Sequence, residues 1–356
     1  MAKTLSRVAA HSGPQRLTLR DVARLAGVSV STASIALAGS ERVSPSTKEA
    51  VLRAAAQLRY IPNSPGRALR SSRVGAIAVV IPHTSHHVFT HPIFMDLLEG
   101  VTAVADELRL TTILSTGLNA QDEAPAYLRI LQARQADGVI VASASVDDEN
   151  VDRLVASGYP VTLVGRRPHR PNLHCVGIDD FNGGMRATEH LIAVHGYRRI
   201  AHIAGPLAHQ SAIDKVEGYR AALGKAGIAY DEAMVIESDY TQEGGYEACA
   251  RLLDSGLPEA IVAANDQMAF GAIEAMRDRG LDAPQDIAIV GYDDIGLARV
   301  MQPQLTTVHA DLVEVGRLAA ERLLTLLDGE EPSPVQRELP TTLVVRSSCG
   351  CASASP

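Results

Sequence analysis

The apolar positions of the chain follow two different patterns, and the pattern changes near residue 74. Before it, apolar residues recur at helical spacing in three short segments between 18 and 58. After it, continuous apolar runs such as GAIAVVIP (75–82) alternate with longer stretches at helical spacing. Continuous β-branched runs are typical of strands buried on both faces of a parallel sheet. The sequence therefore predicts a small all-α head followed by a large α/β core.

The core repeats this alternation in two successive runs. Such alternation indicates parallel sheets covered by helices, and two runs indicate two similar lobes with a cleft between them. We expect strands at 75–82, 111–116, 137–143, 160–165, 175–179, 199–205, 234–237, 259–265 and 286–294, and helices at 93–108, before 135, and at 184–195, 212–226, 244–253 and 267–279. Lobe 1 is placed at about 74–177 and 308–339, lobe 2 at about 178–307 and 340–348, and a tail at 349–356.

The head, at 18–73, carries the signals of a helix-turn-helix. Thr18 can cap a first helix that has Asp21 in its first turn. Gly27 follows, where a tight turn needs a positive φ, and Ser29 can cap a second helix. The pair Ser44-Pro45 then begins a third helix, because a cap followed by proline at the first helical position is a common start.

Charge divides the chain in the same way. The net charge is −8, but residues 1–73 hold 12 basic and 3 acidic residues, a net of +9, which leaves −17 on the remainder. A basic head on an acidic body indicates that one end binds a polyanion. Residues 1–17 lack the apolar segment of a secretion signal and are expected to be a disordered leader. No apolar run is long enough for a membrane span, and four cysteines do not suggest a disulfide framework, so we expect a cytoplasmic protein.

The sequence does not favour an enzyme. It contains no G-x-S-x-G, H-E-x-x-H, phosphate-binding glycine loop or C-x-x-C. Asp293 and Asp294 are adjacent, so on an extended strand end they point apart and do not form a catalytic pair. We therefore predict no catalytic activity and no cofactor. A sugar-binding protein of a transport system is another alternative, but it would need a secretion signal and would lack the basic head.

The head resembles the DNA-binding head of the LacI/GalR family of bacterial transcriptional regulators. The matching stretches are TLRDVARLAGVS, VSPSTKEAVLRAAAQLRYIPN and the Arg67-Ala68-Leu69 segment. In the core, the stretches GGMRATEHLIAVHGYRRIAHIAGP, VAANDQMAFGAIEAM, DIAIVGYDD, QLTTVHAD and LVVRSS extend the resemblance to about residue 348. The resemblance implies a transcriptional regulator associated with the nucleoid, with a core similar to periplasmic sugar-binding proteins.

The resemblance also implies that the second helix enters the major groove of operator DNA. The family usually has arginine where Ile35 stands. Isoleucine offers only apolar contact, for example to a thymine methyl, so a guanine preference is not expected; a core position is the alternative for this side chain. The expected DNA-binding residues are Thr18, Val30, Ser31, Thr32, Ser34, Ile35, Arg42, Asn63, Arg67 and Leu69.

Residues 61–73 correspond to the hinge of the family, which becomes a short helix on operator DNA. Leu69 matches a leucine that wedges into the minor groove, where it would unstack a base step and bend the duplex. Pro65 and Gly66 depart from the family pattern, and Gly66 lowers helix stability, so we expect a hinge that is less helical away from DNA; a plain flexible linker is the alternative. Since two heads read a near-palindrome, the expected partners are double-stranded operator DNA and a second copy of the chain, as a homodimer with a tetramer as the alternative.

Polar residues that follow the predicted strands are candidates for a small-molecule site, because ligands of open α/β sheets bind outside the carboxyl ends of the strands. Asn265 and Asp266 follow one strand and Asp293 ends another. A carboxylate accepts from two hydroxyls at once, which suits a sugar diol. The alternative role of Asn265 and Asp266 is to cap the following helix.

Three further effector residues come from the family resemblance. Phe94 matches an aromatic residue that stacks on effector rings, although a core position fits it equally well. Lys215 stands where the family usually has arginine, so the charge is kept and the bidentate fork is lost. Arg166, directly after a predicted strand, is a weaker candidate.

We expect a repressor controlled by a sugar or sugar derivative. The identity of the effector, its action as inducer or co-repressor, and the choice between repressor and activator stay open.

Segment 82–94 (PHTSHHVFTHPIF) contains His83, His86, His87 and His91. Their spacing matches no standard zinc pattern and no cysteine is near in sequence. We therefore expect a solvated loop near the mouth of the cleft, with a metal site as the minor alternative, and no metal is predicted for the chain.

Overall fold

The structure is a computed structural model and describes residues 17–37, 42–60, 73–117, 124–133 and 135–352. The chain divides into two compact units, Met1–Val74 and Gly75–Pro356. No helix in the described part of the chain is long and apolar enough to cross a membrane. Apart from Leu17 and Arg73, the predicted leader and hinge lie outside the described residues, and so do three of the predicted DNA contacts (Asn63, Arg67 and Leu69).

The first unit is a cluster of three short helices, α1 (Leu19–Leu25), α2 (Val30–Leu37) and α3 (Pro45–Gln57), around a small core of valine and alanine side chains. The predicted start signals are confirmed. The Ser29 hydroxyl accepts from the backbone N–H of Thr32 (3.0 Å), and the Ser44 hydroxyl accepts from the N–H of Thr47 (3.3 Å). Gly27 takes the positive φ of +67° that the turn between α1 and α2 requires.

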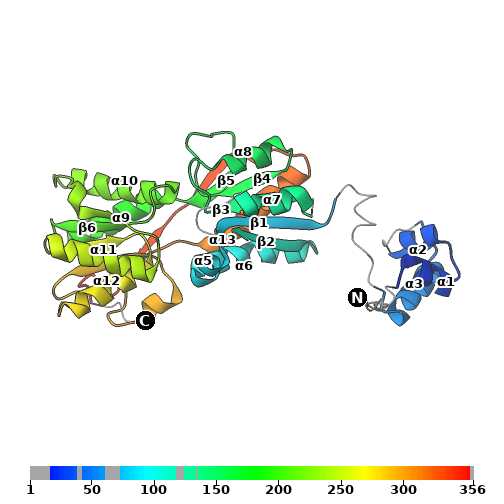
Figure 1. Cartoon of the computed structure of the whole chain (residues 1–356), viewed down its shortest axis with the longest axis horizontal. Coiled ribbons are helices and arrows are strands. Elements are labelled where there is room, and N and C mark those ends of the chain that lie inside the picture. Colours follow the sequence, from blue (N-terminus) through cyan, green and yellow to red (C-terminus); the bar gives the residue numbers. More distant parts are fainter. Residues whose placement is uncertain (1–16, 38–41, 61–72, 118–123, 134, 353–356) are drawn as a thin grey trace, which may run out of the picture. The chain divides into compact units, whose positions relative to one another are not determined.

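Lobe 1 of the second unit contains a six-stranded parallel sheet in the order β11-β5-β4-β3-β1-β2 (Figure 1). Its strands are β1 (Ala76–Thr84), β2 (Thr111–Gly117), β3 (Gly138–Ala142), β4 (Val161–Val164), β5 (Cys175–Ile178) and β11 (Gln336–Leu339). The helices of this lobe are α5 (Ser85–Thr90), α6 (Pro92–Glu107), α7 (Ala124–Ala133), α8 (Glu149–Ala156) and α13 (Leu312–Leu327).

Lobe 2 contains the second six-stranded sheet, in the order β12-β10-β9-β8-β6-β7. Its strands are β6 (Ile200–Ala204), β7 (Val235–Glu237), β8 (Ala260–Ala263), β9 (Ala288–Asp293), β10 (Thr306–His309) and β12 (Thr342–Val344). The helices are α9 (Asp180–His195), α10 (Gln210–Lys225), α11 (Gln242–Ser255) and α12 (Asp266–Asp278), with short 3-10 turns η1 (Glu232–Met234) and η2 (Gly296–Arg299). β12 is antiparallel to β10, an exception to the predicted parallel order.

The chain passes between the two lobes three times, after β5, after β10 and after β11 (Figure 1). The second passage lies slightly later than the predicted boundary at 308, because β10 stays in the lobe 2 sheet through His309. The compact part also extends beyond the predicted end at 348, since Cys349 is fully buried. Both sheets agree with the predicted α/β class.

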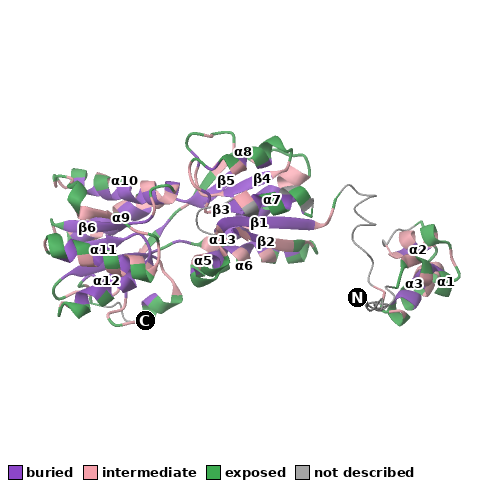
Figure 2. Ribbon diagram, in the orientation of Figure 1, coloured by how far each residue is buried: buried purple, intermediate pink, exposed green. Residues whose placement is uncertain are grey.

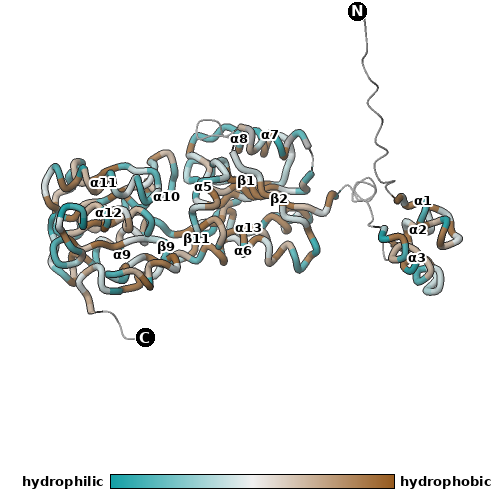
Figure 3. The backbone as a smooth tube through the Cα atoms, turned by 60° about the horizontal axis from the view of Figure 1, so that its bottom comes forward, coloured by the Kyte–Doolittle hydropathy of each residue, from teal (hydrophilic) through white to brown (hydrophobic). Residues whose placement is uncertain are grey.

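Apolar strands fill the centre of each lobe. The first seven residues of β1 are all buried (Figure 2), and the backbone tube is brown along this strand (Figure 3). This burial on both faces is the physical reason why the strand shows a continuous apolar run in the sequence instead of alternation.

Helices α6 and α13 approach each other backbone to backbone in lobe 1. A Cβ atom on Gly100 would lie 1.9 Å from the carbonyl oxygen of Val313, and one on Gly316 would lie 2.1 Å from that of Leu97. No side chain fits in either gap, so the two glycines are needed for this close contact.

We expect Gly100→Ala to lower the free energy of unfolding by about 1–3 kcal/mol, because the added methyl group forces α6 and α13 apart. Gly224→Ala is the matched control. It lies in α10 with no atom within 4 Å of the new Cβ, so the higher helix propensity of alanine should leave stability unchanged or raised by up to about 1 kcal/mol. Thermal unfolding of both variants checks this, and equal melting temperatures would contradict the close helix contact.

Candidate functional site

A cavity of about 300 Å³ lies between the two lobes. The carboxyl ends of β9 and β10 form its wall in lobe 2, and the first turns of α6 and α13 form its wall in lobe 1. Carboxylates dominate the polar part of the wall, which therefore suits a ligand rich in hydroxyl donors. The residues that line the cavity are Pro92, Asp96, Asp293, Asp294, Ile295, Gly296, Arg299, His309, Ala310, Asp311, Leu312 and Val313.

Asp293 ends β9 at the wall of this cavity. Its backbone has φ +101°, a conformation that residues other than glycine rarely adopt. Burial raises the pKa of the carboxyl group to about 7, against the attraction of Lys215 and with repulsion from Asp180 and Asp96. A backbone held in a costly conformation and a carboxyl group that changes charge near neutral pH are both typical of functional positions.

Lys215 lies in α10 with only 6% of its surface exposed. Its ammonium group is 3.3 Å from Oδ1 of Asp180 and 3.9 Å from the centre of the Tyr292 ring. Burial disfavours the charge, but the carboxylates of Asp180 and Asp293 outweigh it and raise the pKa of Lys215. The predicted residues Lys215 and Asp293 are thus brought together with Asp180, which begins α9.

Arg166 follows β4 in lobe 1 and forms a forked ion pair with Asp214 of α10 in lobe 2. Its Nε lies 3.1 Å from Oδ2 and its Nη2 lies 2.5 Å from Oδ1 of that carboxylate. Glu338 of β11 is 3.4 Å from the same guanidinium group. The geometry therefore gives Arg166 a role as a connection between the lobes, and an effector contact by this residue stays a prediction.

Further hydrogen bonds join the lobes. The side-chain amide of Gln267 donates to the carbonyl oxygen of Thr90 (3.0 Å), and the backbone N–H of Val146 donates to the carbonyl oxygen of Ala208 (2.8 Å). Because several contacts cross between the lobes, a ligand that changes the angle between them must exchange these contacts for others.

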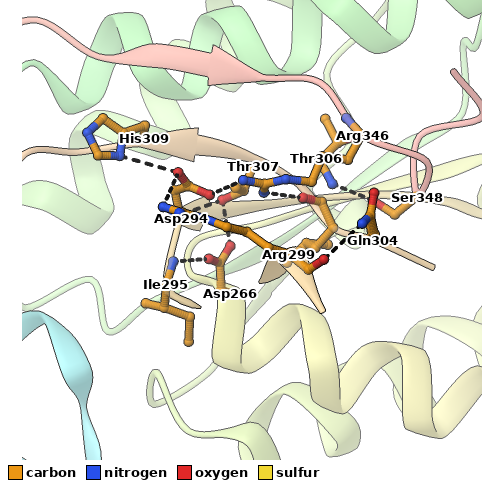
Figure 4. Close-up of polar contacts among 11 residues, drawn as sticks. Asp266, Asp294, Ile295, Arg299, Gln304, Thr306, Thr307, His309, Arg346 and Ser348 are labelled. Carbon is orange, nitrogen blue, oxygen red and sulfur yellow. Dashed lines mark hydrogen bonds and ion pairs between the residues drawn. The ribbon is translucent and has the colours of Figure 1, made fainter. Parts of the chain in front are cut away.

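Asn265 and Asp266 start α12, and both are more than 95% buried. Asn265 caps the helix, since its Oδ1 accepts from the N–H of Met268 (2.8 Å), while its amide group donates to the carbonyl oxygen of Tyr240 (2.9 Å). Asp266 accepts from the Thr307 hydroxyl (2.5 Å) and, through its other oxygen, from the N–H of Ile295 (2.9 Å), as Figure 4 shows. In this arrangement Asp266 has no exposed surface, so the geometry supports a structural role in place of the predicted effector contact.

Asp294 faces a different set of partners from Asp293. Its carboxylate lies 2.6 Å from Arg346, 3.7 Å from Arg299 and 3.5 Å from the ring of His309 (Figure 4). Its φ of +59° turns the chain away from the strand. Asp293 and Asp294 both line the cavity, but only Asp294 is tied up by these arginine and histidine partners.

The histidine-rich segment is not the solvated loop that we predicted. β1 continues through His83, and α5 starts after Thr84, whose hydroxyl accepts from the N–H of His87 (3.2 Å). The rings of His83 and His87 stack with centroids 4.6 Å apart, and those of His87 and His91 with centroids 3.9 Å apart. Apolar and aromatic packing explains the difference: Phe94, only 5% exposed, lies against all three rings, and His86 is the exposed member of the group.

Phe94 therefore occupies the core position that was its alternative interpretation. His91 connects the histidine cluster of lobe 1 to lobe 2, because its Nε2 lies 3.1 Å from the carbonyl oxygen of Tyr240. The histidine cluster thus supports the side of the cavity formed by α6 and also contributes to the contact between the lobes.

The cluster predicts a pH dependence of stability. Burial, with repulsion from neighbouring histidines, lowers the pKa of His83 to about 4 and that of His87 to about 3, from 6.5 in an unfolded chain. Above pH 6.5 these two histidines are neutral in both the folded and the unfolded chain, so their titration does not change the free energy of unfolding. As the pH falls below 6.5, these histidines become protonated in the unfolded chain but stay neutral in the folded chain. The free energy of unfolding therefore decreases by up to about 2 kcal/mol per histidine at pH 5.

We therefore expect His87→Phe to lose less stability than the parent between pH 7 and pH 5, measured by chemical denaturation. The charged or titratable groups near this ring are His83, His91, His209 and Asp239, and they are unchanged in the variant. His86→Phe, at the exposed neighbouring position, should follow the parent. Parallel curves for all three proteins would show that His87 is not kept neutral in the folded state.

In the head, the predicted DNA-binding residues of α2 lie together. Val30 and Ser31 are exposed, while Thr32, Ser34 and Ile35 are half-buried. The core of the head is formed instead by Val22, Ala23, Ala33, Ala36, Val51, Ala54 and Ala55, with seven partly buried apolar residues against it that do not include Ile35. This placement leaves Ile35 outside the helix-packing face, consistent with the predicted groove contact.

Thr18 and Arg42 lie at other points of the head surface. Both are exposed, and the N–H and hydroxyl of Thr18 donate to the Asp21 carboxylate (2.9 and 2.7 Å). These hydrogen bonds lower the pKa of Asp21. Thr18 is therefore held by the first turn of α1, and its contact with DNA stays a prediction.

Sequence reasoning missed two acidic residues that pair with predicted site residues. Asp180 directly follows the predicted strand 175–179, so the rule that selected Asn265 and Asp293 could have found it. Asp214 precedes Lys215 in the chain, but its pairing with Arg166 joins residues 48 apart, and no local signal predicts such a contact.

Comparison with known proteins agrees with both units. Residues 18–63 match the family model described as bacterial regulatory proteins of the lacI family, and residues 75–344 match that of periplasmic binding proteins and the sugar-binding domain of the LacI family. The chain is 36% identical to the HTH-type transcriptional regulator CelR of Thermobifida fusca over 94% of this chain and 98% of that protein. It is 33% identical to the catabolite control protein A of Priestia megaterium over 93% of this chain and 99% of that protein.

Solved structures give the same result. A complex of the transcriptional regulator CelR with cellobiose aligns with a TM-score of 0.73 at 35% identity, over 94% of this chain and 100% of that one. The lac repressor dimer bound to operator and the anti-inducer ONPF aligns with a TM-score of 0.83 at 28% identity, over 94% and 99%. The resemblance found in the sequence is confirmed: the chain belongs to the lacI family of bacterial regulatory proteins and is a DNA-binding transcriptional regulator.

Proposed function

We propose that this regulator is a repressor whose affinity for operator DNA is controlled by a small polar effector, a sugar or sugar derivative, bound between the lobes of its core. It acts in the cytoplasm as a homodimer on a near-palindromic operator. The core serves binding and performs no catalysis. Asp293 and Lys215 are the residues to which we assign effector contact, with Asn265 as a further candidate through its unused hydrogen-bonding capacity.

One observation carries this proposal: Asp293, Lys215 and Asp180 converge from three elements beside the cavity between the lobes. A cation that pairs with Asp180 and is attracted by Asp293 favours a fixed arrangement of the site, so that hydroxyl donors of a ligand meet acceptors that are already oriented. The cellobiose complex of CelR supports a carbohydrate as the class of ligand. A ligand between the lobes can rearrange the contacts that join them, such as the ion pair of Arg166 with Asp214, and thereby change the angle between the lobes.

A ligand screen on the full chain tests the proposal. Mono- and disaccharides, cellobiose among them, and nucleosides as a contrasting class are added at millimolar concentration, and the melting temperature is recorded. A true ligand at 100 times its Kd stabilises by about 2.7 kcal/mol, which is easily detected. Sugars that raise the melting temperature should also change operator affinity in a gel-shift assay. Stabilisation by nucleosides alone would refute the sugar class, and a sugar that binds without any change in DNA affinity would refute the switch.

A further inference from the structure

A second cluster of reactive side chains lies in lobe 2, away from the cavity between the lobes. Cys349 and Cys351 follow β12, and His190 and His195 lie in the second half of α9. One ligand atom from each of the four residues lies within 4.8 Å of all the others. Both cysteines are free thiols, and each residue of the cluster is buried or half-buried.

The distances within the cluster fit a tetrahedral metal site. His190 Nε2 lies 3.4 Å from the sulfur of Cys349 and 3.7 Å from that of Cys351, and His195 Nε2 lies 3.3 Å from the sulfur of Cys351. In a tetrahedral zinc site the Zn–S bond is about 2.3 Å and the Zn–N bond about 2.0–2.1 Å, which places sulfur and nitrogen about 3.6 Å apart. The three observed separations fall on both sides of that value.

We propose that Cys349, Cys351, His190 and His195 bind one Zn²⁺ ion in a closed tetrahedral site. Two thiolates and two imidazoles form the Cys₂His₂ donor set of structural zinc sites. The cluster contains no carboxylate, and soft sulfur ligands do not suit Mg²⁺ or Ca²⁺.

The surroundings of the cluster support this assignment. Gly350 has φ +97°, which turns the chain between the two cysteines, and a Cβ at this position would already meet the His195 ring at 3.4 Å. The Thr306 hydroxyl donates to the sulfur of Cys349 at 3.1 Å, and His190 lies on the other side of that sulfur within hydrogen-bonding distance. A hydroxyl that donates to a metal-binding sulfur is a typical outer contact of such sites.

An ion can reach the cluster from solvent, because Cys351 and Gly350 border a surface cavity of about 420 Å³. The bound ion would fasten the C-terminal segment to α9. Ser348, the residue before the cluster, accepts from the N–H of Thr306 (2.8 Å) and donates to the carbonyl oxygen of Ile289 (2.7 Å). The site would therefore join α9, β9 and β10 of lobe 2 through one short segment of chain.

Cobalt titration of the reduced, metal-free full chain tests the proposal. Co²⁺ bound by thiolates gives sulfur-to-cobalt charge-transfer bands that a site made only of histidines cannot give. We expect these bands to saturate at one equivalent per chain, together with the visible bands of tetrahedral Co²⁺. Zn²⁺ should abolish them at one equivalent and raise the melting temperature.

Cys351→Ser and His195→Ala should lose the one-to-one cobalt spectrum. Both positions are only half-buried, so these variants are expected to fold, and Cys351→His should restore binding with a weaker charge-transfer band. Cys249→Ala and His87→Ala are the matched controls, because they remove a buried cysteine and a clustered histidine elsewhere, and they should keep the spectrum.

Three results would overturn the proposal. One is the absence of charge-transfer bands in a parent protein whose thiols are shown to be free. Another is a spectrum that survives in both Cys351→Ser and His195→Ala. The third is the loss of the spectrum in the His87→Ala control, which would place the metal at the histidine cluster of lobe 1.

Discussion

Residues 1–73, separated from the core, are expected to bind operator DNA about 10²- to 10⁴-fold more weakly than the full chain. The head folds around its own small core, and its single recognition helix α2 is eight residues long. Such a helix reads only a few base pairs. In the proposed dimer the second head binds an operator half-site as an intramolecular event, and the higher effective concentration accounts for the gain in affinity.

Fluorescence anisotropy on a labelled near-palindromic duplex, selected by the full chain from a random library, measures both affinities at the same salt concentration. The slope of affinity against salt should be about twice as steep for the full chain, because two heads displace counterions from twice as many phosphates. The core alone, Gly75–Pro356, is the control and should not bind, since the basic excess of the chain lies before residue 74. If the affinity of the isolated head for the operator were within tenfold of that of the full chain, the result would contradict binding as a dimer.

Elements that depend on local chemistry were predictable from the sequence. Caps such as Ser29 and Ser44 act on the first turn of their own helix, and central strands such as β1 and β3 are buried on both faces, so each of these elements leaves a signal within a few residues. Helix α5 was missed because it has six residues and only one buried apolar side chain, Val88. Its stability comes from stacking of the histidine rings on each other and on Phe94, a contact that no periodicity reveals.

The candidate site was predictable in part for the same reason. The position of Asp293 at a strand end places it at the edge of a parallel sheet, and that edge is where the cavity lies. Whether such a residue is free to bind depends on partners that are distant in sequence. The Thr307 hydroxyl of β10 donates to Asp266, which follows β8 two strands away, and Arg346 pairs with Asp294 across 52 residues of sequence. These pairings arise only from the folded arrangement, so the same rule selected both Asp266 and Asp293.

Asp293→Asn is expected to weaken effector binding by roughly 10- to 150-fold, while operator binding without effector stays unchanged. A hydrogen bond to a charged group is worth about 1.5–3 kcal/mol, and this substitution removes the charged acceptor without changing the size of the side chain. In the parent, effector and operator should change each other's affinity by the same factor, typically about 5- to 150-fold. In the variant, DNA binding should persist and respond only to much higher effector concentrations.

The same substitution should stabilise the protein, which separates a functional from a structural role. Burial raises the pKa of Asp293 to about 7 from 3.8, so holding this group in the folded state costs free energy that grows as the pH rises from about 4 to 7 and then stays constant. Asparagine carries no such cost. Lys215 keeps Asp180 as a partner 3.3 Å away, so we expect a gain on the order of 1–2 kcal/mol at pH 8 and little difference at pH 4.

Calorimetric unfolding at the two pH values, with effector titrations by isothermal calorimetry at pH 8, measures both effects on one set of samples. Asp254→Asn is the matched control, because this exposed aspartate pairs with Arg279 in lobe 2 and does not line the cavity, so the substitution should change neither quantity. A variant that keeps its effector response would move the binding site away from Asp293. A variant that is less stable at pH 8 and also loses operator binding would make Asp293 a structural residue, since stability and function would then depend on the same contacts.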